Sequence, residues 1–143
     1  MSHAAPTRDA FPFWTIIDVR WGDMDAMGHV NNTVYFKYCE SARIELLRGL
    51  GIHGRAEGST HGPTLVHAAC DFKREVKYPA VLDVGIRVES MTHRTFRMQY
   101  GMFLQGTDTL VAVAVSVNAW LDYAAGHAVR MPDDLRELLA SYQ

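Results

Sequence analysis

The spacing of hydrophobic positions in the first half of the chain changes from an alternating pattern to a helical one. From Phe13 to Trp21 one set of alternate positions is largely apolar, which predicts a β-strand. From Asn32 to Leu50 apolar residues recur every three or four positions, which predicts a long helix. The helical face consists of Tyr35, Tyr38, Cys39, Ala42, Leu46 and Leu50. Asparagine is a favourable first cap, and the glycines at 49 and 51 are typical stop signals.

The second half of the chain returns to a period of two and keeps it. After a predicted loop over 51–63, we expect four strands. Their predicted ranges are 65–76, 82–88, 95–104 and 109–121. The links are short, as in Tyr78-Pro79-Ala80, so consecutive strands are expected to pair as antiparallel neighbours. A segment from Pro132, with leucines at helical spacing, predicts a short C-terminal helix.

The order of these elements favours an α+β fold. One long helix cannot cover both faces of a five-stranded sheet, so we expect an antiparallel sheet wrapped around that helix. The length suits a single domain over 1–143, with residues 1–10 expected to be flexible. The last strand is apolar on both faces, so we also expect a second copy of the chain to cover part of it.

Composition and charge argue against several classes of function. Fourteen basic and sixteen acidic residues give a net charge of −2, which argues against a nucleic-acid binder. No apolar run is long enough to span a membrane, and the polar N-terminus lacks the apolar core of a secretory signal, so we expect a cytoplasmic protein. The two cysteines and seven scattered histidines have no metal-ligand spacing, so we predict no metal site and no cofactor.

Polar chemistry is concentrated where the first strand passes into the long helix, in the segment WGDMDAMGHVNN from Trp21 to Asn32. Free backbone N–H groups and the helix dipole at a helix start attract developing negative charge. A carboxylate a few residues upstream, as at Asp25, is placed to act on the same carbonyl group. Asp-x-x-Gly before a helix is also an ordinary turn and cap, so this segment alone leaves both interpretations open.

Two longer segments carry a family resemblance. RWGDMDAMGHVNNTVYFKYCESAR, followed downstream by VKYPAVLDVGIRVESMTHRTF, resembles the signature of hotdog-fold thioesterases, in particular the 4-hydroxybenzoyl-CoA thioesterase-like group. The resemblance follows nearly the whole chain in order and length. It implies a hotdog fold, hydrolysis of the thioester of an acyl-CoA substrate, and assembly as a homodimer or homotetramer.

The resemblance assigns roles within the polar segment. The family's catalytic carboxylate corresponds to Asp25, which acts either as a nucleophile or as a general base on water. Gly28 is expected to allow a tight turn or a close approach of substrate. His29 is expected either to assist catalysis or to hold the loop. Asp23 is expected to be structural.

Four residues further along are also expected at the substrate. Asn31 and Asn32 are expected to fix the loop and cap the helix, so that backbone N–H groups polarise the substrate carbonyl. Tyr35 is expected to pack beside the substrate rather than react. Glu40 is expected either to face a neighbouring active site or to pair with Arg43, three residues along the helix.

The resemblance also indicates a CoA-binding loop. His93, Arg94 and Thr95 lie in the strand-to-strand loop that binds the nucleotide in relatives, and Lys77 is a further candidate. A guanidinium suits phosphate groups. Exposed loop cations are often simply solvated, which is the alternative for these four residues.

Three other functions compete with acyl-CoA hydrolysis. A catalytically silent hotdog module that binds acyl-CoA is one, and a hotdog hydratase is another. A partial likeness to acyl-carrier-protein thioesterases, which carry Asp-x-Asn-x-His before Val-Asn-Asn, is weakened by Met27 at the middle position. An acyl carrier protein therefore stays a secondary candidate partner. A metal site built from Asp23, Asp25 and His29 ranks below these.

Overall fold

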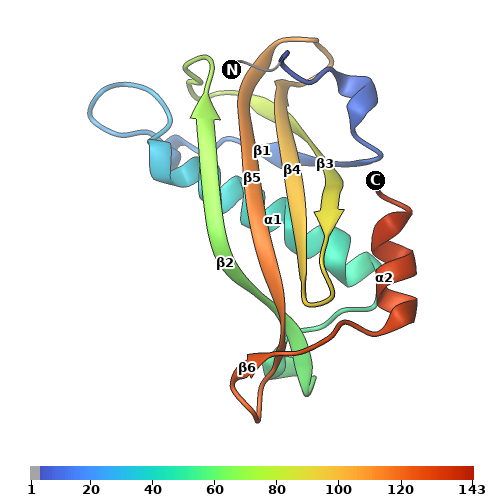
Figure 1. Cartoon of the computed structure of the whole chain (residues 1–143). Coiled ribbons are helices and arrows are strands. Elements are labelled where there is room, and N and C mark those ends of the chain that lie inside the picture. The colour runs from blue at the N-terminus through green and yellow to red at the C-terminus, as the bar shows by residue number, and fades with distance from the viewer. Residues whose placement is uncertain (1–3) are drawn as a thin grey trace.

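The computed structural model describes residues 4–143 and contains one curved sheet, one long helix and one short helix (Figure 1). The elements in chain order are β1 (Phe13–Asp18), α1 (Asn32–Gly49), β2 (His61–Phe72), β3 (Val81–Met91), β4 (Thr95–Leu104), β5 (Leu110–Asp122), β6 (His127–Ala128) and α2 (Asp133–Ala140). Short 3-10 turns lie at Arg8–Ala10, Trp21–Asp23 and Arg55–Glu57. No helix within residues 4–143 is both long and apolar enough to cross a membrane.

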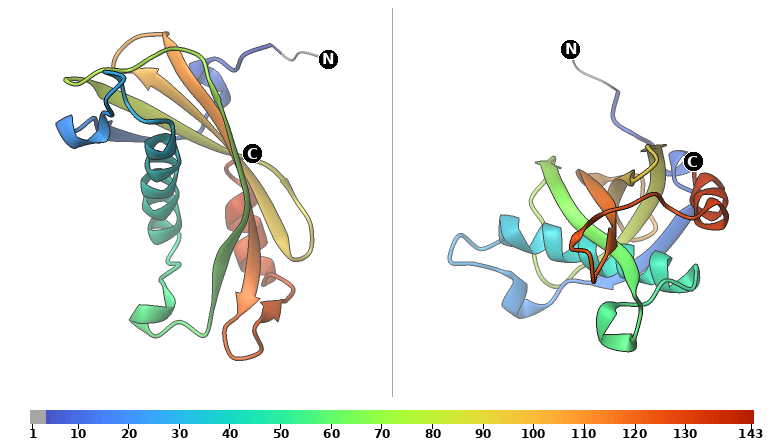
Figure 2. Two further views of the ribbon diagram at one scale, coloured as in Figure 1. Left: turned by 90° about the vertical axis from the view of Figure 1, so that its left-hand side faces the viewer. Right: turned by 60° about the horizontal axis from the view of Figure 1, so that its bottom comes forward.

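The strands form one antiparallel sheet in the order β1-β3-β4-β5-β2, and β6 pairs with the end of β5. Figure 2 shows the sheet curling around α1, which lies along the concave side. The predicted α+β hotdog fold, a five-stranded antiparallel sheet around one long helix with a short C-terminal helix, is confirmed. β6 is an addition to that prediction.

The predicted neighbour of the second strand is wrong. β2 pairs with β5 at the edge of the sheet, whereas β3 pairs with β1 and β4. The short segment Tyr78-Pro79-Ala80 therefore does not join antiparallel neighbours. The connection from 73 to 80 crosses three strand spacings, about 14 Å, which eight extended residues reach easily.

The predicted bounds of three strands are also wrong. β3 was predicted over 82–88 but extends to Met91. β2 begins at His61 and ends at Phe72, so the preceding loop is shorter than expected and the end of the predicted strand belongs to the crossing connection. β1 ends at Asp18, because the next residues leave the sheet and Trp21–Asp23 form a 3-10 turn. The alternation of side chains continues past the point where backbone pairing stops, which explains why the predicted ends of β1 and β2 lie too far along the chain.

The core lies between α1 and the concave face of the sheet. Side chains from the helix, such as Ala42 and Leu46, are almost fully buried against β3 and β4. The opposing strand residues are Leu82, Val84, Ile86, Met98, Tyr100 and Met102. This packing fixes the helix along its length, so its N-terminal end has a defined position relative to the sheet.

A second apolar group covers the convex face of the sheet, and we call Arg8, Phe11, Trp14 and Phe103 the outer-face cluster. The Phe11 ring packs edge-on to Trp14 and Phe103. A Cβ placed on Gly85 of β3 would lie 2.7 Å from the Cβ of Phe11, so the ring needs a glycine beneath it.

Arg8 ties the N-terminal segment to this face. Its Nη2 donates to Asp83 at 2.8 Å, and its guanidinium lies 4.9 Å from the Phe103 ring centre. Residues 1–3 of the segment expected to be flexible lie outside the described residues. The flexibility of residues 4–10 stays a prediction, although Arg8 has these contacts.

Candidate active site

The loop between β1 and α1 contains a tight turn built on Gly28. The Gly28 N–H donates to the Asp25 carbonyl at 3.0 Å, and the Asp25 N–H donates to the His29 carbonyl at 3.1 Å. Gly28 has a φ of 88°, in the left-handed region that side chains rarely adopt. The tight turn expected at Gly28 is therefore present, and it places Asp25 beside the start of α1.

The carboxylate of Asp25 is held at both oxygens. Its Oδ1 accepts from the Met27 N–H at 2.8 Å, and its Oδ2 accepts from the Asn31 side-chain Nδ2 at 2.9 Å. Asp25 remains partly exposed. The carboxylate thus has a fixed orientation and stays accessible to a substrate.

Asn31 caps the helix with the other atom of the same side chain. Its Oδ1 accepts from the Thr33 N–H at 2.9 Å, and its backbone carbonyl accepts from the Val34 N–H at 3.0 Å. The Asn32 N–H makes no hydrogen bond within residues 4–143. One exposed helix-start donor is therefore free next to the Asp25–Asn31 pair, where the dipole favours negative charge.

Asp23 pins the loop to the second turn of α1. Its Oδ2 accepts from the Tyr38 hydroxyl at 2.7 Å and from the Arg20 N–H at 2.9 Å. Its carbonyl accepts from the Asn31 N–H at 3.0 Å. Burial first, and then the hydrogen bond to Asp23, raise the pKa of Tyr38, so its hydroxyl stays protonated. These contacts match the structural role expected of Asp23.

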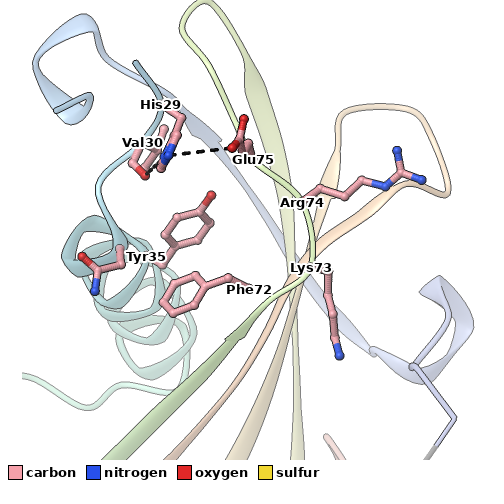
Figure 3. Close-up of a pocket in the computed structure, with 8 residues that line it drawn as sticks. His29, Val30, Tyr35, Phe72, Lys73, Arg74 and Glu75 are labelled. Carbon is pink, nitrogen blue, oxygen red and sulfur yellow. Dashed lines mark hydrogen bonds and ion pairs between the residues drawn. The ribbon is translucent and has the colours of Figure 1, made fainter. Parts of the chain in front are cut away.

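A recess of about 240 Å³ opens between the start of α1 and the connection after β2 (Figure 3). His29 and Tyr35 line one side and Phe72 and Glu75 line the other, with the Tyr35 and Phe72 ring centres 5.1 Å apart. His29 Nε2 lies 3.9 Å from a Glu75 oxygen. In Figure 3 the Lys73 side chain, which also borders this recess, points away from His29.

Burial raises the pKa of Tyr35, with smaller contributions from Cys70 and Glu75. Its hydroxyl makes no hydrogen bond within the part of the chain that the structure describes. Tyr35 is therefore a neutral wall of the recess in this geometry. The sequence interpretation missed Glu75 at this recess, because it lies in a segment that alternates like an ordinary strand. Phe72 was one of the aromatic residues that could line a substrate pocket.

Glu40 and Arg43 do not pair, so that part of the prediction is wrong. Glu40 accepts from Lys37 at 3.1 Å on the exposed side of α1. Arg43 turns inward and donates to the Tyr100 hydroxyl at 3.1 Å. Both residues line one recess, where Glu40 is exposed and Arg43 is buried. A spacing of three in a helix permits contact without requiring it.

The four predicted CoA-binding residues lie at two separate ends of the sheet. Lys77 follows Val76, whose carbonyl accepts from the Val30 N–H at 2.8 Å, so Lys77 is at the junction end. His93, Arg94 and Thr95 form the β3–β4 loop at the opposite end, about 30 Å away along β4. Within one chain these three residues are not brought beside Asp25, and their role in CoA binding stays a prediction.

The β3–β4 loop has structural contacts of its own. The Met131 N–H donates to the His93 carbonyl at 2.9 Å, and the Trp120 N–H donates to the Arg94 carbonyl at 2.8 Å. The backbone is therefore fixed while both side chains stay exposed. No group of three or more His, Cys, Asp or Glu side chains within residues 4–143 is arranged to hold a metal ion.

Comparison with known proteins identifies the family. The model of the thioesterase-like superfamily matches residues 19–139. The chain belongs to this superfamily. The matched range contains the whole β1–α1 loop, all of the sheet after β1 and most of α2.

Three individual proteins are similar to this chain in sequence or in fold. A protein of Pseudomonas aeruginosa strain PAO1 superimposes with a TM-score of 0.89 at 27% identity, covering 96% of both chains. A 1,4-dihydroxy-2-naphthoyl-CoA hydrolase of Synechococcus elongatus is 26% identical over 85% of this chain and 90% of its own length. A 1,4-dihydroxy-2-naphthoyl-CoA thioesterase from Synechocystis shares the fold, with a TM-score of 0.81 at 18% identity over 90% of this chain and 95% of its own.

Proposed function

We propose that the protein is an acyl-CoA thioesterase in which Asp25 is the catalytic carboxylate. The observation that carries the proposal is the position of this carboxylate, held at both oxygens and next to the free N–H of Asn32. Membership of the thioesterase-like superfamily and the similarity to a 1,4-dihydroxy-2-naphthoyl-CoA hydrolase of Synechococcus elongatus support the same reaction.

The proposed mechanism uses both groups on one carbonyl. The Asn32 N–H, with the helix dipole behind it, stabilises the negative charge that develops on the thioester oxygen. Asp25 then either attacks the carbonyl carbon or takes a proton from a water that attacks it. The carbon–sulfur bond breaks and CoA leaves as the thiolate. After attack by water the acyl group is released directly as the acid, whereas after attack by Asp25 a water must first open the anhydride formed with Asp25.

His29 and the surrounding recess have supporting roles in this proposal. Tyr35 and Phe72 provide an apolar surface beside the reacting group. His29 donates from Nδ1 to the Val30 carbonyl at 3.2 Å in one tautomer, which leaves Nε2 facing Glu75. These contacts favour a role of His29 in holding the loop over direct assistance in catalysis.

The proposed assembly is a homodimer or homotetramer. β2 is an edge strand with one unpaired side, and it exposes 47% of Leu65, 59% of Val66 and 47% of Phe72. An exposed apolar edge strand is a ready pairing surface for another chain. A second copy at this edge would also bring its own β3–β4 loop, with His93, Arg94 and Thr95, to a new position relative to Asp25.

Thiol release from a panel of acyl-CoAs tests the proposal. The panel contains short, medium and long fatty acyl groups and an aromatic acyl group, and each is offered to the native chain and to Asp25→Asn. We expect turnover of at least one substrate and a fall in kcat of about 100-fold or more in the variant. Binding of acyl-CoA without turnover would instead identify a silent module, and turnover of acyl-carrier-protein thioesters alone would change the substrate.

Isotope labelling of the native chain distinguishes the two roles of Asp25. Single turnover in ¹⁸O-labelled water, followed by mass spectrometry of the native chain, places label in the Asp25 carboxylate only if it forms an acyl anhydride that water later opens. Label in Asp25 therefore identifies a nucleophile, whereas label only in the released acid fits both a general base and an anhydride that water opens at its acyl carbon.

A further inference from the structure

Arg43 in α1 is a buried cation without a counter-charge. Its relative exposure is 8%, and its one hydrogen bond within residues 4–143 goes to the neutral Tyr100 hydroxyl. No Asp or Glu carboxylate within residues 4–143 lies at ion-pair distance from it. A buried charge is strongly unfavourable unless an opposite charge or several hydrogen bonds compensate it.

The hydrogen-bond network behind Arg43 does not supply that charge. The Tyr100 hydroxyl is 2.7 Å from Ser116 Oγ, and Ser116 Oγ accepts from Asn118 Nδ2 at 3.1 Å. Burial raises the pKa of Tyr100, and the smaller opposing effects of Arg43 and Ser116 do not reverse the shift. All three partners are therefore neutral, and the positive charge of Arg43 stays uncompensated.

Arg43 forms part of the floor of a recess of about 240 Å³ between α1, β2 and β5. No buried side-chain nitrogen within residues 4–143 lacks a hydrogen-bond partner, so Nε and Nη2 of Arg43, which have none, must remain open to solvent. The recess is the opening beside them. Its remaining lining residues are Thr33, Phe36, Lys37, Cys39, Glu40, Leu65, Ala68, Val115 and Ser116.

The inner part of this recess carries the net positive charge of Arg43. Lys37 and Glu40 lie at the exposed rim and pair with each other at 3.1 Å, so they largely cancel. The walls contributed by Phe36, Leu65 and Val115 are apolar. The recess therefore suits a molecule with an apolar body and a negatively charged end.

The recess is connected to the candidate catalytic loop through the first turn of α1. Thr33 lines the recess and donates from its N–H and its hydroxyl to Asn31 Oδ1. Asn31 in turn donates to Asp25 at 2.9 Å. The ten residues from Thr33 to Arg43 rise about 15 Å along the helix, and the arginine side chain leans back toward the N-terminus.

We infer that this recess binds a carboxylate at the far end of the acyl group, so that the substrate class is the CoA monothioester of a dicarboxylic acid. This inference rests on the proposed function. The recess of about 240 Å³, at about 30 Å³ per water, holds roughly eight non-hydrogen atoms beyond the thioester carbonyl. That corresponds to about four to six methylene groups and the terminal carboxylate, and so to an acyl group of about six to eight carbons. Arg43 forms a charge-assisted bidentate pair with the terminal carboxylate.

The test compares two thioesters of equal chain length, suberoyl-CoA with a terminal carboxylate and octanoyl-CoA with a terminal methyl group. The native chain is expected to have a kcat/KM ratio of suberoyl-CoA to octanoyl-CoA of about 10 to 100, the range for a hydrogen bond to a charged group. Arg43→Met, which keeps an unbranched side chain, is expected to bring the ratio to one or below. Arg48→Met, on the exposed side of the same helix, is the matched control and keeps the native ratio.

The outcomes distinguish this inference from the proposed function. Equal kcat/KM values for both thioesters in the native chain, or an unchanged ratio in Arg43→Met, overturn the carboxylate site while leaving thioesterase activity intact. If no thioester is hydrolysed, the proposed function fails, and the site is tested by calorimetry with free octanoate and with octanamide, a neutral molecule of the same chain length. Binding of octanoate but not of octanamide to the native chain, lost in Arg43→Met, then supports the site.

Two further results complete the test. If Arg43→Met does not fold, inhibition of the native chain decides, and equal inhibition by octanoate and by neutral octanamide overturns the inference. If a carboxylate of a second copy neutralises Arg43, the native chain shows no preference for suberoyl-CoA and Arg43→Met dissociates on size-exclusion chromatography. That result also overturns the inference.

Discussion

Two regions hold the N-terminal part of the chain in place, and they do so by different means. The β1–α1 loop is held by hydrogen bonds between partly exposed polar groups, centred on Asp23, Asp25 and Asn31. The outer-face cluster is held by apolar contact of Phe11 with two glycines and two aromatic rings. The hydrogen bonds of the loop fix the orientation of a few polar groups, whereas the outer-face cluster buries apolar surface area.

This difference separates the expected consequences of mutation. Burial of apolar surface stabilises the folded state in proportion to the buried area and tolerates small shifts of the side chains. A catalytic carboxylate, by contrast, becomes ineffective when the hydrogen bonds that orient it change. Substitutions in the outer-face cluster are therefore expected to lower stability and leave turnover intact. Substitutions in the loop are expected to lower turnover, with smaller effects on stability.

The largest expected effect on stability is that of Phe11→Ala. Phe11 is 4% exposed, and truncation of a buried phenylalanine costs about 3–5 kcal/mol. Thermal unfolding followed by circular dichroism measures the loss, and kcat at 25 °C is expected to be unchanged. Phe36→Ala, at a position that is 37% exposed, is the size-matched control with a smaller loss. A fall in kcat for folded Phe11→Ala would contradict the expectation that the outer-face cluster affects stability but not turnover.

Tyr38→Phe tests the link between the loop and α1. It removes the hydroxyl that donates to Asp23 and is expected to cost about 1–2 kcal/mol, with a several-fold fall in kcat because the loop loses its anchor. Tyr35→Phe removes a hydroxyl without a hydrogen-bond partner in residues 4–143, so urea unfolding should detect less than about 0.5 kcal/mol. Equal losses for the two variants would show that the Asp23 contact does not anchor the loop.

Asn31→Asp separates capping from orientation of the carboxylate. Aspartate is as good a helix cap as asparagine, so stability is expected to change by less than about 0.5 kcal/mol. The variant loses the Nδ2 donor to Asp25 and adds a like charge beside it, so kcat is expected to fall about tenfold or more. Asn31→Ala, which loses both functions, is expected to lose about 1 kcal/mol as well. Full activity in Asn31→Asp would show that this hydrogen bond does not matter for turnover.

The smallest expected effect concerns the ion pair of the outer-face cluster in acid. Burial favours the neutral Asp83 carboxyl, but the Gly106 N–H and Arg8 outweigh it and lower the pKa of Asp83. A lowered folded-state pKa gives stability that is present above the unfolded pKa and is lost as the pH falls through the folded value. The difference in Tm between the native chain and Asp83→Asn should therefore shrink below about pH 4. A difference that stays constant down to pH 2 would contradict this.

Local patterns predicted the elements of this fold well, because side-chain periodicity reflects which face is buried. β4 was predicted at its observed bounds, and α1 within one residue. The partner of β2 was not predictable in the same way, because alternation shows that a strand has a buried face and does not show which strand lies beside it.

Part of the candidate site was accessible from the sequence, and part was not. Asp25, Gly28 and Asn31 are close in the chain, so their turn and cap chemistry is local and visible as a motif. The approach of Glu75 to His29, and the burial of Arg43 against Tyr100, join residues more than forty positions apart. Such contacts depend on the topology of the sheet, which the local pattern leaves open.

The most direct test of the account compares two aspartates in the same loop. Asp25→Asn and Asp23→Asn are measured for kcat on the best acyl-CoA substrate and for Tm. Asp25→Asn is expected to lower kcat by about 100-fold or more with Tm nearly unchanged, whereas Asp23→Asn lowers Tm and retains more of the activity. Turnover of Asp25→Asn within a few-fold of the native chain would contradict the central claim that Asp25 is the catalytic carboxylate.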